Sequence, residues 1–334
     1  MSWETPSPKA EDEAVLVVGH GSRRAKSNEQ VRELADRLES RLDVPVGVGF
    51  IELAEPSLLE ALETLAARVS QVTVVHCSLF AASHVKNDVP LAVNRVRERY
   101  DVEIANGSHL GIHPAILEVL DDRVAAVERD LGVDRAEDGV SVALTARGSS
   151  DPDANGDVHK LARLFYEGRA FDHVEPAFVG VTEPRLQAAV AERAVHDPDA
   201  IVVVPYMLGD GVLTQRVYDW VDDLEAEYPE IRIGASDPLG TTEELVDVLA
   251  DRYREARRDD VAMSCDTCKY KVALPGHADD VGGEAAMEHA LAHLEGDAHD
   301  HDGGHGHDHD HDGDPDPGEG HGHGHDAHDH AGED

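Results

Sequence analysis

Two histidines and a glutamate follow three successive apolar runs of this chain. His20 comes directly after the first run, Glu52 after the second, and His84 in the loop after the third, 32 residues apart each time (52 − 20 and 84 − 52). If the runs are parallel strands, these residues share one sheet edge and can converge. Two imidazoles and a carboxylate suit a divalent transition metal with open coordination positions, and they also suit proton transfer near pH 7. The alternative is three ordinary turn residues.

The chain contains an internal duplication. Three landmarks recur in the same order: Glu55-Pro56 as Glu183-Pro184 (183 − 55 = 128), Leu110-Gly111 as Leu239-Gly240 (239 − 110 = 129), and the turn 19–22 as the turn 146–149 (147 − 20 = 127). Three landmarks at nearly one spacing predict two copies of one domain.

The second copy lacks the residues that suggest chemistry. His20 is replaced by Arg147, Glu52 falls opposite Gly180, and His84 falls opposite Val212. This asymmetry predicts one active site per chain, located where the two halves face each other.

The elements that position these residues alternate between apolar runs and helical patterns. In the first half we expect strands at 14–18, 44–51, 72–80 and 102–106, and helices at 28–42, 56–69, 89–100 and 114–130. In the second half we expect strands at 140–145, 174–181, 201–208 and 231–236, and helices at 158–166, 185–195, 217–228 and 243–257. Ser57 is the expected cap of one helix, His113 is expected to start another, and His76 and Cys77 are expected to pack in the core. The pattern predicts an α/β fold of two tandem, doubly wound parallel sheets covered on both faces.

The repeat also suggests domain boundaries. We expect an active-site domain at 1–130 and a second domain without catalytic residues at 140–258. A segment at 259–294 carries Cys265 and Cys268, and a tail at 295–334 consists largely of His, Asp and Gly. Because such a tail cannot bury a core, we expect it to be disordered.

The composition is strongly acidic. The 334 residues include 69 acidic and 29 basic residues, which gives a formal net charge of −40. Because the charge is spread over ordinary amphipathic helices, we interpret it as adaptation to a high-salt cytosol. Nucleic acid and anionic membranes are not expected partners. The absence of an apolar signal core or a bilayer-length run, together with only three cysteines, indicates a cytoplasmic protein.

The few basic residues cluster near the predicted site. Arg23 and Arg24 follow His20, Lys86 follows His84, and Arg147 occupies the matching turn of the second copy. Cations at this edge of an acidic protein predict a polyanionic ligand. The alternative is that Arg23 and Arg24 open the first helix and point into solvent.

Three separated segments resemble a known family. The run Val17-Val18-Gly19-His20-Gly21-Ser22-Arg23, the strand end Phe50-Ile51-Glu52 with Glu55-Pro56, and Leu79-Phe80 leading into 84–90 are similar to the sirohydrochlorin chelatases of the CbiX type, in their long, duplicated form. The resemblance covers residues 14–257. It implies two flavodoxin-like, chelatase-like domains around a cleft.

The resemblance also implies an activity and roles for residues. Members insert a divalent metal into sirohydrochlorin, a tetrapyrrole with eight carboxylates, and the family's metal-binding and catalytic residues map onto His20, Glu52 and His84. The polyanionic substrate fits the cationic rim of Arg23, Arg24, Lys86 and Arg147. The long form and the His-rich tail favour Co²⁺ and the anaerobic route to cobalamin, in a monomer or dimer. Iron insertion for sirohaem, Ni²⁺ as the metal, and a non-enzymatic metal store or delivery protein remain alternatives.

Two C-terminal features carry further metal chemistry. The run from Met263 to Cys268 resembles a Met-x-Cys-x-x-Cys element that is associated with an iron–sulfur centre in some long-form members. Because a [4Fe–4S] cluster usually takes four cysteines, a zinc site, a redox pair and a free dithiol stay open. The tail offers imidazoles that predict a metal buffer, with a solvated tail as the alternative: His301, His305, His307, His309, His311, His321, His323 and His325.

Overall fold

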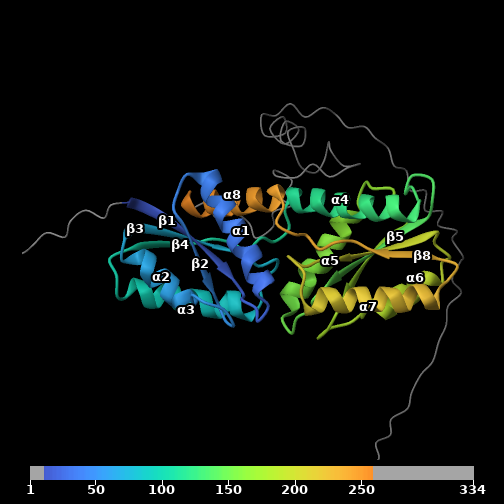
Figure 1. Cartoon of the computed structure of the whole chain (residues 1–334), viewed down its shortest axis with the longest axis horizontal. Helices are drawn as coiled ribbons and strands as arrows, with labels where there is room; N and C mark the ends of the chain where they lie inside the picture. The colour runs from blue at the N-terminus through green and yellow to red at the C-terminus, as the bar shows by residue number, and fades with distance from the viewer. Residues whose placement is uncertain (1–10, 259–334) are drawn as a thin grey trace, which may run out of the picture.

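The computed structural model describes residues 11–258 of the chain, and strands and helices alternate throughout this range (Figure 1). Cys265, Cys268 and the His-rich tail lie outside the described residues. The first half comprises β1 (Glu11–Gly19), α1 (Ala25–Leu42), β2 (Val46–Phe50), α2 (Leu58–Ala66), β3 (Val69–His76), α3 (Ser83–Arg97), β4 (Glu103–Asn106) and α4 (Pro114–Leu131). The second half comprises β5 (Val140–Ala146), α5 (Pro152–Tyr166), β6 (His173–Phe178), α6 (Leu186–Ala194), β7 (Ala200–Pro205), α7 (Val212–Glu227), β8 (Arg232–Ala235) and α8 (Glu243–Arg257).

Each half builds one parallel sheet, with strand orders β2-β1-β3-β4 and β6-β5-β7-β8. The prediction of two tandem, doubly wound parallel sheets is therefore confirmed. The chain passes from β1 to the edge strand β2 and then returns across β1 to β3. Loops leave β1 and β3 in opposite directions, and this divergence is where open α/β sheets bind ligands.

The central strands are apolar along their length because helices cover both faces of each sheet. Residues 15–18 of β1 have no exposed surface, and every residue of β5 and β7 is buried. Parallel strands buried on both sides read as continuous apolar runs, which is the pattern that predicted them. Within residues 11–258, none of the helices is long and apolar enough to cross a bilayer.

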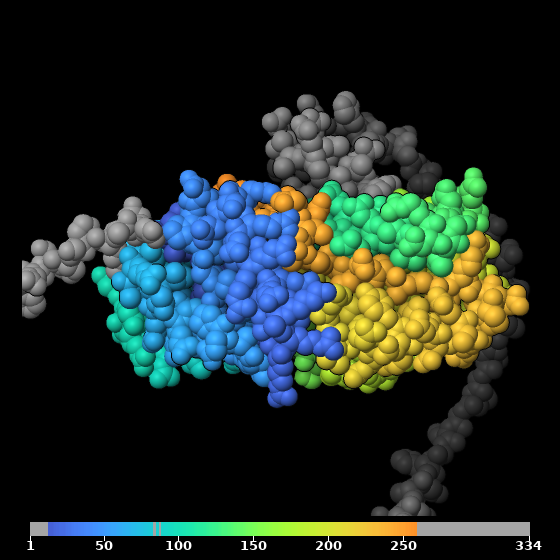
Figure 2. All heavy atoms as spheres, viewed as in Figure 1, coloured from blue at the N-terminus to red at the C-terminus, as the bar shows by residue number. Residues whose placement is uncertain are grey.

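The last helix of each repeat covers the other repeat's sheet. Helix α8 packs on α1, β3 and β4, whereas α4 packs on β7 and β8. Figure 1 shows α8 above the first sheet and α4 above the second, and Figure 2 shows the two halves in contact along their boundary. The packed units therefore exchange a helix between the two repeats, and the domain boundaries at 130 and 140 stay a prediction.

Two arginines hold this exchange at equivalent positions. Arg252 of α8 is fully buried and donates to the carbonyl oxygens of His109 (2.7 Å) and Leu110 (2.5 Å), which precede α4. Arg123 of α4 donates to the carbonyl oxygens of Pro238 (2.9 Å) and Leu239 (2.8 Å), which precede α8. Each exchanged helix therefore holds the segment that leads into the other.

The exchange also joins the two interiors. One apolar core runs from β1 and α1 through α8 and α4 to β5 and α5 without a break. Two smaller cores lie on the opposite faces of the sheets, under α2 and α3 and under α6 and α7. The two halves are consequently fixed to each other along one side.

Helix starts differ most from the sequence expectation. Helix α5 begins at Pro152, six residues before the expected start at 158, because Asp151 caps it by accepting from the Asp153 N–H at 3.1 Å. Asp-Pro is a recognised helix-start signal, with the aspartate as cap and the proline at the first helical position. The caps at Ser57 and His113 are confirmed: Ser57 forms a capping box with Glu60, and His113 Nδ1 accepts from the Ala115 N–H at 3.2 Å.

Candidate active site

The turn after β1 brings His20 and Glu52 together. Gly21 has φ +93°, and a Cβ at this position would lie 1.7 Å from the Glu52 carbonyl oxygen, so only glycine fits. This close approach lets the Glu52 N–H donate to the His20 carbonyl at 3.0 Å. His20 Nε2 then lies 3.2 Å from Glu52 Oε1, and the two side chains are 37% and 43% exposed. The pair is accessible to an ion from solvent.

The second half keeps this turn with different side chains. Gly148 has φ +82°, a Cβ there would lie 1.9 Å from the Gly180 carbonyl oxygen, and the Gly180 N–H donates to the Arg147 carbonyl at 3.0 Å. Asn28 and Asn155 brace the two turns alike, each donating to a serine carbonyl at 2.7 Å. The scaffold is duplicated, whereas the ligand-type side chains are present only in the first half.

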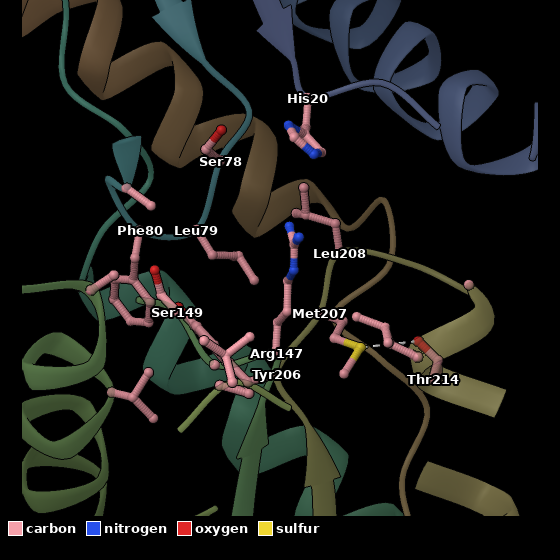
Figure 3. A pocket seen from close by; sticks show the side chains of 18 of the residues that line it. His20, Ser78, Leu79, Phe80, Arg147, Ser149, Tyr206, Met207, Leu208 and Thr214 are labelled. Atoms are coloured by element: carbon pink, nitrogen blue, oxygen red, sulfur yellow. Dashed lines mark hydrogen bonds between the residues drawn. The ribbon is translucent and has the colours of Figure 1, made fainter. Parts of the chain in front are cut away.

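Both turns open into one cleft of about 630 Å³ between the halves. Figure 3 shows His20 on the first-half wall and the Arg147 side chain pointing toward it from the second half. The strand ends add apolar surface from both sides, including Leu79 and Phe80 after β3 and Tyr206, Met207 and Leu208 after β7. The cleft therefore combines a His–Glu pair, a cation and apolar walls.

The predicted rim cations differ in their surroundings. Arg147 is exposed, lines the cleft and forms no ion pair with a described residue. Arg24 also lines the cleft, and Arg23 is exposed outside its lining. Lys86 instead pairs with Asp151 and Asp153 of the second half, at 2.7 Å each. These hydrogen bonds, Asp151 first, raise the pKa of Lys86, and the ammonium lowers the pKa of Asp151.

His84 does not lie in a loop as expected, because helix α3 begins at Ser83 rather than at 89. The helix continues through Pro90, although proline within a helix lacks the N–H for the backbone hydrogen bond. The His84 backbone therefore belongs to the first turn of α3, after the strand next to β1. The described part of the structure includes the backbone of His84 but not its side chain. Among the described side chains, no group of three His, Cys, Asp or Glu converges as a metal site.

The side chains expected in the core are buried there. His76 is 1% exposed and its Nε2 lies 2.9 Å from Asn106 Oδ1, and burial lowers its pKa. Cys77 is 3% exposed, and burial raises the pKa of its thiol to about 12, which leaves it protonated and unreactive.

Two aromatic residues of the cleft, Phe80 and Tyr206, were not predicted from the sequence. The ring centroids of Phe80 and Tyr206 lie 5.4 Å apart. The buried Tyr206 hydroxyl has no hydrogen-bond partner among the described residues. Burial raises the pKa of this phenol. The position of Tyr206 in the sequence could have indicated its place in the cleft, because it follows β7 directly, at the sheet edge that carries Arg147.

Two doubly wound sheets that face each other across a cleft, with a solvent-facing His–Glu pair on one wall, define the two-lobed chelatase-like class. The CbiX family model matches residues 14–127 and again residues 141–256, once for each half. The chain belongs to the CbiX family.

Relatives in this family carry two names. The chain is 32% identical over 270 residues to a sirohydrochlorin cobaltochelatase of Priestia megaterium, covering 80% of this chain and 87% of the relative. It is 30% identical over 246 residues to a sirohydrochlorin ferrochelatase of Bacillus subtilis, covering 73% and 91%. The solved structure of SirB from Bacillus subtilis with Fe³⁺ superimposes with a TM-score of 0.65 at 29% identity, covering 73% of this chain and 95% of SirB.

Proposed function

We propose that this protein is a sirohydrochlorin cobaltochelatase, which inserts Co²⁺ into the tetrapyrrole as in anaerobic cobalamin synthesis. One observation carries the proposal: His20, whose Nε2 lies 3.2 Å from Glu52 Oε1, faces Arg147 across an apolar cleft, and Arg147 forms no ion pair with a described residue. The family membership and the 32% identity to a cobaltochelatase support it.

The metal in this reaction is a substrate, so its ligands must be able to release it. His20 and Glu52 are each more than a third exposed, unlike the closed ligand shell of a structural site. A neutral imidazole and a carboxylate at this separation can share one divalent ion. His84, in the helix turn after the neighbouring strand, is the third ligand in our proposal.

The opposite wall suits the other substrate. Sirohydrochlorin combines a flat apolar ring with eight carboxylates at its edge. From the second half, Met207 offers apolar surface to the ring and Arg147 a guanidinium group to the carboxylates, and the first half adds Leu79, Phe80 and Arg24. Arginine binds carboxylates through two parallel charge-assisted hydrogen bonds. Because Arg147 has no ion-pair partner among the described residues, it need not break a contact first.

The reaction exchanges two protons for one metal ion. Two pyrrole N–H bonds break, four ring nitrogens coordinate the divalent ion, and no electrons are transferred. His20 or His84 can accept a proton once it releases the metal, and water carries the protons away. Glu52 stabilises the ion or orients the His20 ring beside it. Such an exchange needs neither a nucleotide nor a redox cofactor.

Iron is the second candidate metal, because ferrochelatases are also among the relatives at 29–30% identity. The same side chains bind Fe²⁺, Co²⁺ and Ni²⁺, and intrinsic affinity rises in that order. Affinity alone would therefore favour nickel over both, so our expectation of cobalt rests on the 32% identity to a cobaltochelatase, and metal supply selects the ion in the cell.

The test is anaerobic incubation of the purified protein with sirohydrochlorin and Co²⁺, Fe²⁺ or Ni²⁺, followed by absorption spectroscopy. We expect catalysed conversion, fastest with Co²⁺, and a rate proportional to enzyme concentration. Faster conversion with Fe²⁺ at equal metal concentration would assign the ferrochelatase activity. Metal binding in equilibrium dialysis without catalysed conversion of any metal would instead indicate a store or delivery protein.

A further inference from the structure

Exposed apolar side chains gather at the second-half wall of the cleft. Among the described residues, five large hydrophobic side chains are exposed: Leu53, Leu91, Val181, Val195 and Val212. Val181 and Val212 line the cleft, and they are 64% and 55% exposed. Leu53 directly follows Glu52 and is the repeat counterpart of Val181 (181 − 53 = 128). Single exposed apolar residues are common, but two of these five line one cleft and a third is the repeat counterpart of one of them, which suggests a ligand surface.

The backbone at Val181 adds a second, independent observation. Val181 has φ +68°, and the Thr182 N–H donates to the Gly180 carbonyl at 2.7 Å, which closes a three-residue turn around Val181. A β-branched residue in the left-handed region is unfavourable, and glycine or asparagine adopts it more readily. Strain of this kind tends to persist at functional sites.

The two halves have the same backbone conformation at Leu53 and Val181, whereas the residues that precede these two differ. Leu53 also has a positive φ, +61°, and is 51% exposed. The preceding residue is Glu52 in the first half and Gly180 in the second. The duplication has therefore kept an exposed apolar side chain in a left-handed turn even where the neighbouring carboxylate is absent.

Strand order places the second-half residues in one row. The loops after β6 and β5 carry Val181 and Arg147, Val212 is the first residue of α7 after β7, and β5 lies between β6 and β7. A cation thus stands between two exposed valines at the sheet edge that lines the cleft. In the first half the same edge carries Glu52 and His20 and leads to the turn with His84.

We infer that Val181 and Val212 form an apolar ledge that contacts one face of the sirohydrochlorin ring while Arg147 binds a carboxylate at its edge. This inference rests on the proposed function. A ring with an apolar face and an anionic perimeter matches two apolar contacts that flank a cation. Valine has few rotamers, so ordering it against the ring costs little conformational entropy.

The variants Val181→Asn and Val212→Thr test this ledge. Asparagine tolerates the left-handed backbone, and threonine keeps the shape of valine, so each change removes apolar character without removing the local fold. Val195→Asn is the matched control, because Val195 is 77% exposed at the end of α6 and lies outside the cleft lining. We expect the double variant to raise KM for sirohydrochlorin about tenfold, because the binding free energy lost corresponds to roughly half of that of burying one apolar side chain. The kcat should stay within twofold of wild type.

Two further measurements separate the outcomes. Titration of metal-free sirohydrochlorin into the protein should show the same weakening in Kd, and the melting temperature of Val181→Asn should equal or exceed that of wild type. An unchanged KM in the double variant, with normal wild-type turnover, would overturn the ledge and leave the proposed function intact. If the double variant showed both a higher KM and a lower melting temperature, Val181 and Val212 would have a structural role instead. Absence of catalysed turnover in wild type would overturn the proposed function itself.

Discussion

The two halves of this molecule share a backbone and differ in the side chains that leave it. Gly21 and Gly148 approach the opposing loop so closely that neither accepts a Cβ, and the same main-chain hydrogen bonds follow in both turns. His20 and Arg147 extend from these turns into the cleft. Duplication therefore preserved the geometry that the backbone requires, while the side chains facing the cleft diverged toward ligand-type residues on one wall and a cation with apolar residues on the other.

The sharpest test of this division is the removal of one residue from each wall. We expect His20→Ala to lower kcat for metal insertion at least about a hundredfold, because it removes a metal ligand or proton acceptor. Arg147→Ala should mainly raise KM, because it removes only a carboxylate contact. Steady-state kinetics at saturating metal checks both changes, and melting curves verify that each variant is folded. Wild-type activity in a His20→Ala/His84→Ala double variant would refute the assignment.

The two arginines that hold the exchanged helices provide a second comparison. Arg252 is fully buried, so Arg252→Met leaves two carbonyl oxygens without donors and should lower the free energy of unfolding by about 3 kcal/mol. Arg123→Met should cost less, about 1–2 kcal/mol, because Arg123 is only half-buried and its guanidinium is less fully desolvated than that of Arg252. Urea denaturation measures both. Arg254→Met is the control on the same helix, since its side chain is 47% exposed. Equal losses at Arg123 and Arg254 would argue against the exchange being held in this way.

Transplanting the first-half pair into the second half sharpens the comparison further. A Cβ at Gly180 would meet its nearest atom, Arg185 Nη1, at 3.5 Å, so a side chain fits there. In a His20→Ala background, Arg147→His with Gly180→Glu should restore Co²⁺ binding in equilibrium dialysis, because the turns share one geometry. Catalysis should stay low, because the cation that faces the metal is lost. Failure to bind Co²⁺ would show that the two turns are not equivalent as ligand scaffolds.

Salt should affect the fold and the substrate wall in opposite directions. Because the net charge is −40, screening reduces self-repulsion as the Debye length falls from about 10 Å at 0.1 M to about 3 Å at 1 M. We expect the melting temperature to rise by several degrees from dilute buffer to molar KCl. KM for sirohydrochlorin should rise over the same range, because attraction to Arg147 weakens. A flat melting temperature would contradict our reading of the acidity as adaptation to high salt.

The smallest expected effect concerns pH and the segment before α4. Burial, followed by the nearby Arg252, lowers the pKa of His109 from 6.5 to about 4. The unfolded chain therefore binds more protons than the folded chain between these values, and stability is lost as pH falls from 6.5 toward 4. His109→Gln keeps the carbonyl that Arg252 uses and removes this contribution. The difference in melting temperature between wild type and variant should change across this pH range and stay constant above pH 7.

The alternation of elements and the duplication could be read directly from the sequence. Buried parallel strands leave continuous apolar runs, and the boundaries 243–257 of the last helix match the structure because Glu243 and Glu244 mark its start and Arg257 its end. Helices α3, α5 and α7 begin earlier than expected, and for α5 the local Asp151 cap accounts for the earlier start. Lys86 was expected to contact the substrate. In the structure Lys86 instead pairs with two carboxylates of the other half, 65 and 67 residues away (151 − 86 and 153 − 86). A contact between Lys86 and the substrate stays a prediction.

The sequence alone determined which half carries the histidines and the glutamate, because residue identity and repeat offset are properties of the chain. It also determined that these residues follow strand ends, because strand periodicity is local. Only the tertiary structure decided that α4 and α8 exchange sheets, that Arg123 and Arg252 hold the exchange, and that Arg147 faces His20. Each of these depends on contacts between residues at least 69 positions apart (200 − 131), and such contacts arise from the packing of whole sheets and helices rather than from any local pattern.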